Sequence, residues 1–179
     1  MINNTRDSYG VISKSLHWVS GLTIIALFAL GFWMVDLSYY SQWYKTAPHW
    51  HKSLGILLLA LTIIRLLVKA KQEKVLAIAS HSNLVKKTSS FTHKALYLLM
   101  VSVFVSGYLI STADGRAIEV FDWFSVVSLG AFVDNQEDLA GIIHRYVAYS
   151  LIALALLHAM AAIKHHLIDK DDTLKRMLK

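Results

Sequence analysis

Four long apolar stretches, separated by polar connections, dominate the chain at about residues 16–35, 51–68, 95–111 and 141–166. An α-helix needs roughly 17–25 residues to cross the ~30 Å apolar layer of a bilayer. The third stretch is at the short end of that range, which snorkelling flanking residues can accommodate. No stretch alternates with a period of two, which argues against a transmembrane β-barrel. We therefore predict an all-α protein, a transmembrane four-helix bundle in which residues 1–179 form one domain.

Two segments outside the apolar middles need a separate interpretation. The residues before the first stretch lack the charged start and small-residue cleavage site of a signal peptide, so we expect that stretch to remain as a helix. The connection at 112–140 is too long for a simple turn. Its sequence VFDWFSVVSL is amphipathic enough for a short helix that lies on the outer face of the membrane. A packed loop is the alternative.

Composition supports a membrane protein and narrows its chemistry. The chain is 55% hydrophobic and 17% charged, with a mean hydropathy of +0.46, which is too apolar for an ordinary soluble domain. It has no cysteine, which excludes disulfides, iron–sulfur clusters, thiolate metal sites and covalently attached c-type haem.

The charges predict an orientation. Six lysines lie at 69–94 and further basic residues lie in the C-terminal tail, whereas the connection at 112–140 is acidic. The positive-inside rule then places both termini in the cytoplasm. The net charge of +6 is explained in this way without a nucleic-acid partner.

The fourth stretch carries two histidines, His144 and His158, that lie fourteen residues apart. Fourteen residues are close to four helical turns, so both imidazoles leave the same face about 21 Å apart. Ionisable residues inside a span are costly and usually functional. His17 lies at the cytoplasmic end of the first stretch and His51 at the outer end of the second. Depth therefore predicts two pairs, His17 with His158 and His51 with His144.

Each of these histidines has a small residue four positions further on, on the same helix face. These residues are Gly21, Gly55, Ala148 and Ala162. A flat porphyrin needs such cleared space, although membrane helices also favour small residues where they pack together. We interpret the pattern as two bis-histidine haems b. A zinc or di-iron site is less favoured, because the inner half of the bundle has no carboxylates.

Other polar residues have weaker interpretations. Arg65, the only charged residue well inside a span, is expected to bond a propionate of the inner haem. His93 is expected to begin the third helix at the cytoplasmic interface, where a snorkelling residue is slightly favoured over a contact with a haem propionate or a quinone. His165 is a candidate proton donor to a quinone. We expect His49 at the surface and His81 in a loop. Near the outer haem, Lys52 and Arg145 are alternatives for propionate binding.

Several motifs together resemble the bacterial cytochrome b561 family, in particular its YceJ-type branch. They are SLHW, HKSLGILL, THKALYLL, SGYLISTADG, IHRYVAYSLIALALLHA and KHHLIDKDDTLKRM, and they cover nearly the whole chain. The resemblance implies a small diheme cytochrome b of the bacterial inner membrane, multi-pass, with His17, His51, His144 and His158 as haem iron ligands.

The resemblance also implies electron exchange with a quinone such as ubiquinone. Our leading hypothesis is transmembrane electron transfer, with the lipid bilayer, a quinone and a redox partner protein at either face as partners. Whether the chain is itself an enzyme stays open. One alternative is a superoxide (or other donor):ubiquinone oxidoreductase, although the acidic outer connection would repel an anion. Others are a haem b anchor subunit for a dehydrogenase and, least favoured, a transition-metal transporter.

Overall fold

The computed structural model describes every residue from Met1 to Lys179 and is mostly helical. Four helices are long and apolar enough to cross a membrane, as the sequence predicts. The elements in chain order are α1 (Val11–Met34), α2 (Thr46–Lys71), α3 (Asn83–Thr112), β1 (Ile118–Val120), β2 (Phe124–Val126), α4 (Gln136–Leu167) and α5 (Lys175–Leu178).

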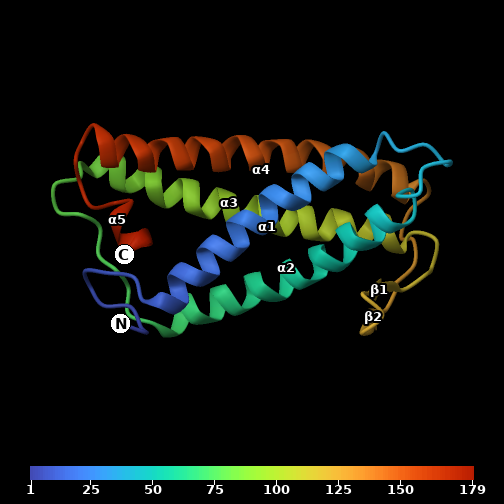
Figure 1. Ribbon diagram of the computed structural model, residues 1–179, viewed down its shortest axis with the longest axis horizontal. Helices are drawn as coiled ribbons and strands as arrows, with labels where there is room; N and C mark the ends of the chain where they lie inside the picture. The colour runs from blue at the N-terminus through green and yellow to red at the C-terminus, as the bar shows by residue number, and fades with distance from the viewer.

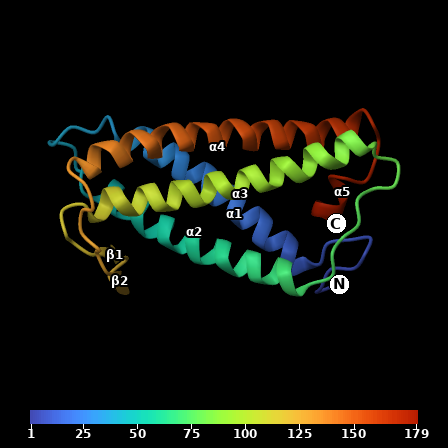
Figure 2. The same ribbon diagram turned by 180° about the vertical axis from the view of Figure 1, so that it is seen from behind.

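The four long helices form two pairs. Helix α3 packs along α4 and α1 packs along α2, whereas α2 touches α3 sparsely and α1 touches α4 sparsely. In Figure 1, α1 runs diagonally between α4 and α2, and Figure 2 shows α3 running in front of it from the opposite side. The interface between the two helix pairs is therefore the least tightly packed part of the bundle.

Small polar residues make up much of the buried interior. Ser20, Thr62 and Thr112 are almost completely buried, and each donates a side-chain hydrogen bond to the carbonyl four residues earlier in its own helix. That bond satisfies the hydroxyl without any partner on another helix. Small side chains let the helix backbones approach closely.

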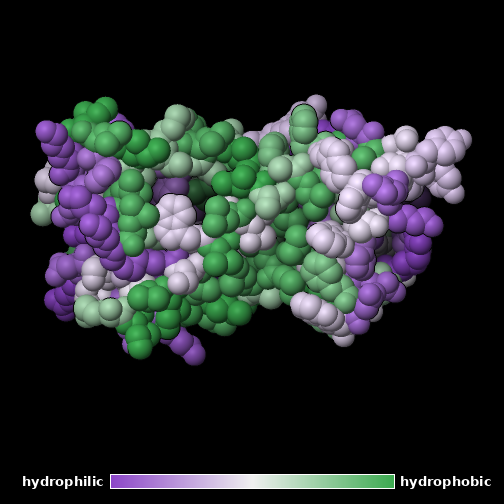
Figure 3. Space-filling view, in the orientation of Figure 1, coloured by the Kyte–Doolittle hydropathy of each residue, from purple (hydrophilic) through white to green (hydrophobic).

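Large apolar side chains face outward instead. Leu22, Ile25 and Leu156 are each more than half exposed. On the face seen in Figure 3, hydrophobic residues cover the middle of the molecule and hydrophilic residues gather at its two ends. This distribution suits a surface that contacts lipid in the middle and water at both ends.

Both chain termini lie at one end of the bundle, which we call the termini end (Figures 1 and 2). The opposite end, which carries β1 and β2, is called the hairpin end. At the termini end the N-terminal segment joins the α2–α3 connection, because Leu76 N donates to Arg6 O at 2.8 Å. Helix α5 closes over the same end, where Trp18 Nε1 donates to Met177 O at 2.8 Å.

The helices extend beyond the apolar stretches. Helix α3 begins at Asn83, well before residue 95, because Ser82 caps it by accepting a hydrogen bond from Val85 N. Helix α2 includes Pro48, which lies in its first turn, where a missing N–H costs little. Hydropathy identifies only the part of a helix that meets lipid, so polar extensions into water are underestimated.

The short helix expected within 112–140 is wrong. The strands β1 and β2 form an antiparallel hairpin, in which Val120 lies opposite Phe124. Phe121 and Asp122 adopt left-handed backbone angles, with φ of 46° and 60°, which reverse the chain direction. Phe121 N donates to Ser53 Oγ at 3.1 Å, and this bond ties the hairpin to α2. The alternative of a packed loop is closer to this arrangement.

Candidate functional site

The first histidine pair lies in the half of the bundle nearer the termini. His17 comes from α1 and His158 from α4, and their ring centres are 6.4 Å apart with planes at 70°. Both rings are partly buried. His17 and His158, which the sequence pairs by depth, are thus neighbours in space.

The second pair lies towards the hairpin end. His51 of α2 and His144 of α4 have ring centres 6.2 Å apart, with planes at 71°. Helix α4 supplies one member of each pair, which follows from the fourteen-residue spacing of its histidines. Each histidine pair also joins α4 to α1 or α2, across the least tightly packed interface between the helices.

The two separations fit a metal ion held between facing imidazoles. Two imidazole–metal bonds of about 2.0–2.1 Å, each extended by the roughly 1.1 Å from ring nitrogen to ring centre, span about 6.3 Å. The observed 6.4 and 6.2 Å agree with this span. The 5.2 Å between His93 and His158 and the 4.7 Å between His81 and His165 are too short for it.

Four glycines surround the pairs, and they fall into two kinds. At Gly21 and Gly55, an added Cβ would meet nothing within 4 Å, so the space beside them is open, as a porphyrin edge requires. At Gly31 an added Cβ would lie 3.0 Å from His51 Cε1, and at Gly107 it would lie 3.1 Å from His144 Cε1. Gly31 and Gly107 therefore leave room for the imidazoles themselves.

Sequence reasoning missed Gly31 and Gly107. Both lie in helices other than the one that carries the histidine they face. No spacing within one helix reveals such a relation. The available signal was a glycine on a neighbouring helix at the depth of a paired histidine.

Hydrogen bonds orient His144. Its Nδ1 lies 3.1 Å from Val103 O and 3.1 Å from Ser106 Oγ, both on α3. Since a carbonyl only accepts, Nδ1 carries the proton and Nε2 keeps its lone pair. This is the tautomer that a metal-ligating histidine adopts. By contrast, His51 Nδ1 is buried with no hydrogen-bond partner.

Arg65 lies beside the first pair. Its Nη2 is 2.8 Å from His17 Nδ1, and its guanidinium lies 5.5 Å from the centre of the Tyr97 ring. A guanidinium only donates, so His17 accepts at Nδ1 and holds its proton on Nε2 in this arrangement. Arg65 is therefore at the expected depth, next to His17.

His93 differs from its expected position. It lies well inside α3 instead of at its start, and its ring centre is 5.2 Å from that of His158. The residue is exposed, in contrast to the partly buried His17 and His158. A third imidazole thus adjoins the first pair.

Two further histidines, His81 and His165, are paired with aspartates. His165 Nδ1 lies 2.8 Å from Asp169 and 2.9 Å from Asp171, and His81 Nε2 lies 2.7 Å from Asp171. His81 is in the α2–α3 connection, as expected for a loop residue. Burial favours a raised pKa for Asp171, but hydrogen bonds from Thr173 and His81 outweigh it and hold that pKa below its usual value.

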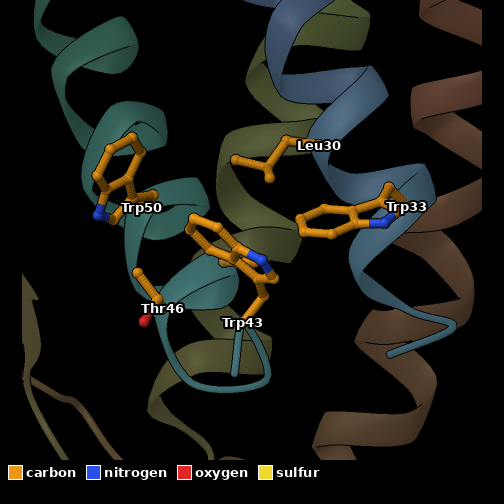
Figure 4. Close-up of a pocket in the computed structure, with 6 residues that line it drawn as sticks. Leu30, Trp33, Trp43, Thr46 and Trp50 are labelled. Carbon is orange, nitrogen blue, oxygen red and sulfur yellow. The ribbon is translucent and has the colours of Figure 1, made fainter. Parts of the chain in front are cut away.

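An apolar pocket lies at the hairpin end, near the start of α2. It has a volume of about 210 Å³ and is lined by Leu30, Trp33, Trp43, Thr46, Ala47 and Trp50 at the hairpin end. Figure 4 shows Trp33 and Trp43 approaching each other from α1 and from the α1–α2 connection. Tryptophans at this depth are typical of a membrane interface, so we assign the cavity to the aromatic belt.

Comparison with known proteins supports one family throughout. Residues 8–179 match the family model described as prokaryotic cytochrome b561. The protein called Cytochrome b561 homolog 2 from Escherichia coli (strain K12) is 48% identical over 175 residues, covering 98% of this chain and 93% of that relative. The Probable superoxide oxidase CybB of Yersinia pestis is 27% identical over 181 residues, covering 95% of both chains.

Proposed function

The chain belongs to the prokaryotic cytochrome b561 family, whose activity is transmembrane electron transfer, and we propose that this chain uses two haem b groups, each held between two histidines. The observation that carries the proposal is the pair of imidazole separations, 6.4 and 6.2 Å, at two depths of the bundle. Haem b supplies one-electron chemistry between ferric and ferrous iron, and two histidine ligands leave no position open for oxygen.

The four histidines would bind the two haems at two depths of the bundle. His17 and His158 ligate the haem at the termini end, and His51 and His144 ligate the other. Helix α4 is the shared wall of both sites. The sparse contact between the two helix pairs supports this arrangement, because a porphyrin would occupy that interface.

The contact between Arg65 and His17 suggests a role for Arg65. His17 would ligate through Nε2 only in the tautomer that carries the proton on Nδ1, and in that tautomer Nδ1 cannot accept from Arg65. We propose that the guanidinium then turns to a propionate of the same haem, forming a charge-assisted bond in a low dielectric.

The proposed orientation follows from the charges. The termini end would face the cytoplasm of a bacterium, and the hairpin end would face outward. The basic α2–α3 connection and C-terminal tail support this assignment. The termini end would be the site of exchange with ubiquinone. His93 is better placed than His165 to contact a quinone, because His93 is exposed and adjoins His158, whereas His165 is held by two aspartates.

The test is the absorbance spectrum and the haem content of the protein purified in detergent. We expect a low-spin b-type spectrum on reduction and two haems per chain. A measured content of one haem per chain would refute the diheme proposal. Absence of haem would refute the electron-transfer role proposed for the histidines. Reoxidation of the reduced protein by added ubiquinone tests the quinone proposal separately.

A second candidate, superoxide oxidation at the hairpin end, is favoured by the printed name of one relative at 27% identity. The local charge opposes it. Arg116, one of the cations available to attract an anion, is already bonded to Asp114 at 2.6 Å. Haem reduction by a superoxide source, measured by stopped flow, decides between this activity and simple transfer. A third candidate, an anchor subunit, predicts stable co-purification of a dehydrogenase.

A further inference from the structure

A cluster of metal-ligating side chains lies at the termini end, outside both histidine pairs. Its members are His81, His165 and Asp171. They come from three segments, namely the α2–α3 connection, the last turn of α4 and the α4–α5 connection. These segments meet where the end of α4 lies beside the start of α3 (Figures 1 and 2).

The donor atoms of the cluster converge. His81 Nε2 lies 2.7 Å and His165 Nδ1 lies 2.9 Å from the same atom, Asp171 Oδ2. The two rings are 4.7 Å apart at 32°. The side chains are only 15%, 17% and 11% exposed, in the order His81, His165 and Asp171. A small ion can therefore reach the cluster, and the protein largely shields it from water.

A further oxygen is available as a fourth ligand. Asp169 Oδ2 lies 2.8 Å from His165 Nδ1. Asp169 also bonds Lys164 Nζ at 2.7 Å, so its coordination to a metal would compete with this exposed ion pair. Solvent-exposed ion pairs contribute little to stability. The ion pair with Lys164 therefore opposes metal binding by Asp169 only weakly.

Two imidazole nitrogens with one or two carboxylate oxygens form a donor set that suits Zn²⁺. Neighbouring ligand atoms around tetrahedral zinc are about 3.3 Å apart, given metal–ligand bonds of about 2.0–2.1 Å. The two nitrogen–oxygen separations of 2.7 and 2.9 Å need to widen by about half an ångström, and all the donor atoms lie within 4.8 Å of one another. The carboxylates supply the negative charge that the inner half of the bundle lacks.

We propose that His81, His165 and Asp171 form a binding site for one Zn²⁺ ion at the termini end, with Asp169 as a fourth ligand. The ion would fasten the α2–α3 connection and the tail to the end of α4. This site shares no residue with the haem sites, so its presence does not depend on the proposed function.

The test uses full-length, haem-loaded protein in detergent after removal of metals with a chelator. Zn²⁺ alone is added, and bound zinc is measured by equilibrium dialysis and elemental analysis. We expect one zinc per chain, a higher thermal unfolding midpoint and an unchanged haem spectrum. No bound zinc, or zinc uptake accompanied by haem loss, would overturn the proposal, since haem loss places the ion at the haem histidines.

Variants separate a zinc site from a hydrogen-bonded cluster that needs no metal. His81→Gln keeps an N–H donor for Asp171 but removes the imidazole ligand. We expect zinc affinity to fall by about 100-fold or more, in line with the effects of losing ligand interactions. Unfolding of the metal-free protein should stay the same. The matched control is His49→Gln at the opposite end, which should bind zinc as the unaltered protein does.

Asp171→Asn tests the carboxylate. It should also lose zinc, while the haem content stays the same. If this variant does not fold, His81→Gln decides the question alone, because its amide preserves the hydrogen bond to Asp171. Zinc binding that is unchanged in His81→Gln would refute the assignment.

Discussion

Gly55 offers a test of whether the open space beside His51 holds a porphyrin. An added Cβ at Gly55 meets nothing within 4 Å in the structure, and the residue lies four positions after His51 on the same face of α2. The substitutions are Gly55→Ala and Gly55→Leu. Both add a Cβ, which at this position meets no other segment of the chain.

In these variants the stability of the haem-free helix should rise, whereas the haem content should fall. Replacing glycine within a helix by alanine or leucine favours the helix by roughly 0.8–1 kcal/mol. Since the added Cβ meets no atom of another segment within 4 Å, the alanine variant meets no steric penalty that would offset this gain. A leucine would occupy the space assigned to the haem at the hairpin end, so haem content should fall from about two to about one per chain. Alanine should weaken haem binding less.

The assay is a pyridine haemochrome titration normalised to protein, together with thermal unfolding of the haem-free protein. The control is Ala60→Leu on the same helix, at a position that is exposed at the surface. That variant should keep both haems. If Gly55→Leu retains two haems with an unchanged spectrum, the open space does not hold a porphyrin, and the haem-cradle interpretation of this glycine is wrong.

Four further predictions concern the histidine pairs. His144→Ala should lose the haem at the hairpin end and His158→Ala the one at the termini end, each leaving about half the reduced α-band absorbance; loss of the same haem from both variants would contradict the pairing. Gly31→Ala should displace the His51 ring, because the new Cβ would lie 3.0 Å from Cε1, and should lower the occupancy of that haem alone, measured by redox titration. Arg65→Gln should lower the midpoint potential of the haem at the termini end, because loss of the guanidinium charge would leave the propionate's negative charge uncompensated and so favour ferric over ferrous iron; an unchanged potential would contradict the proposed contact. The imidazole planes cross at 70° and 71°, so both ferric haems should give the strongly anisotropic low-spin EPR signal of crossed ligands, and a rhombic signal would show parallel rings.

Much of the fold could be predicted from periodicity and length. The four helices, their apolar middles and the shared face of His144 and His158 depend on the dimensions of one helix and of the bilayer. The pairing by depth needed only alternating chain direction across the membrane. For these reasons the two histidine pairs could be expected before any contact between helices was known.

The tertiary structure decided what lies opposite each histidine. The relations of Gly31 to His51, of Gly107 to His144 and of His93 to His158 depend on how one helix is rotated against another, which no spacing within one helix encodes. The hairpin likewise depends on its hydrogen bond to Ser53 of α2.

The cluster around Asp171 illustrates the same division. The sequence predicts that His81 lies in a loop and that His165 ends the fourth helix, with no reason to bring them together. Their sequence positions are far apart, and they meet because the termini-end connections fold onto one another. Sequence alone determined the helices and the depth of their polar residues, because both follow from local geometry and the membrane. The contacts between segments required the folded structure, because they depend on the rotation and packing of whole elements.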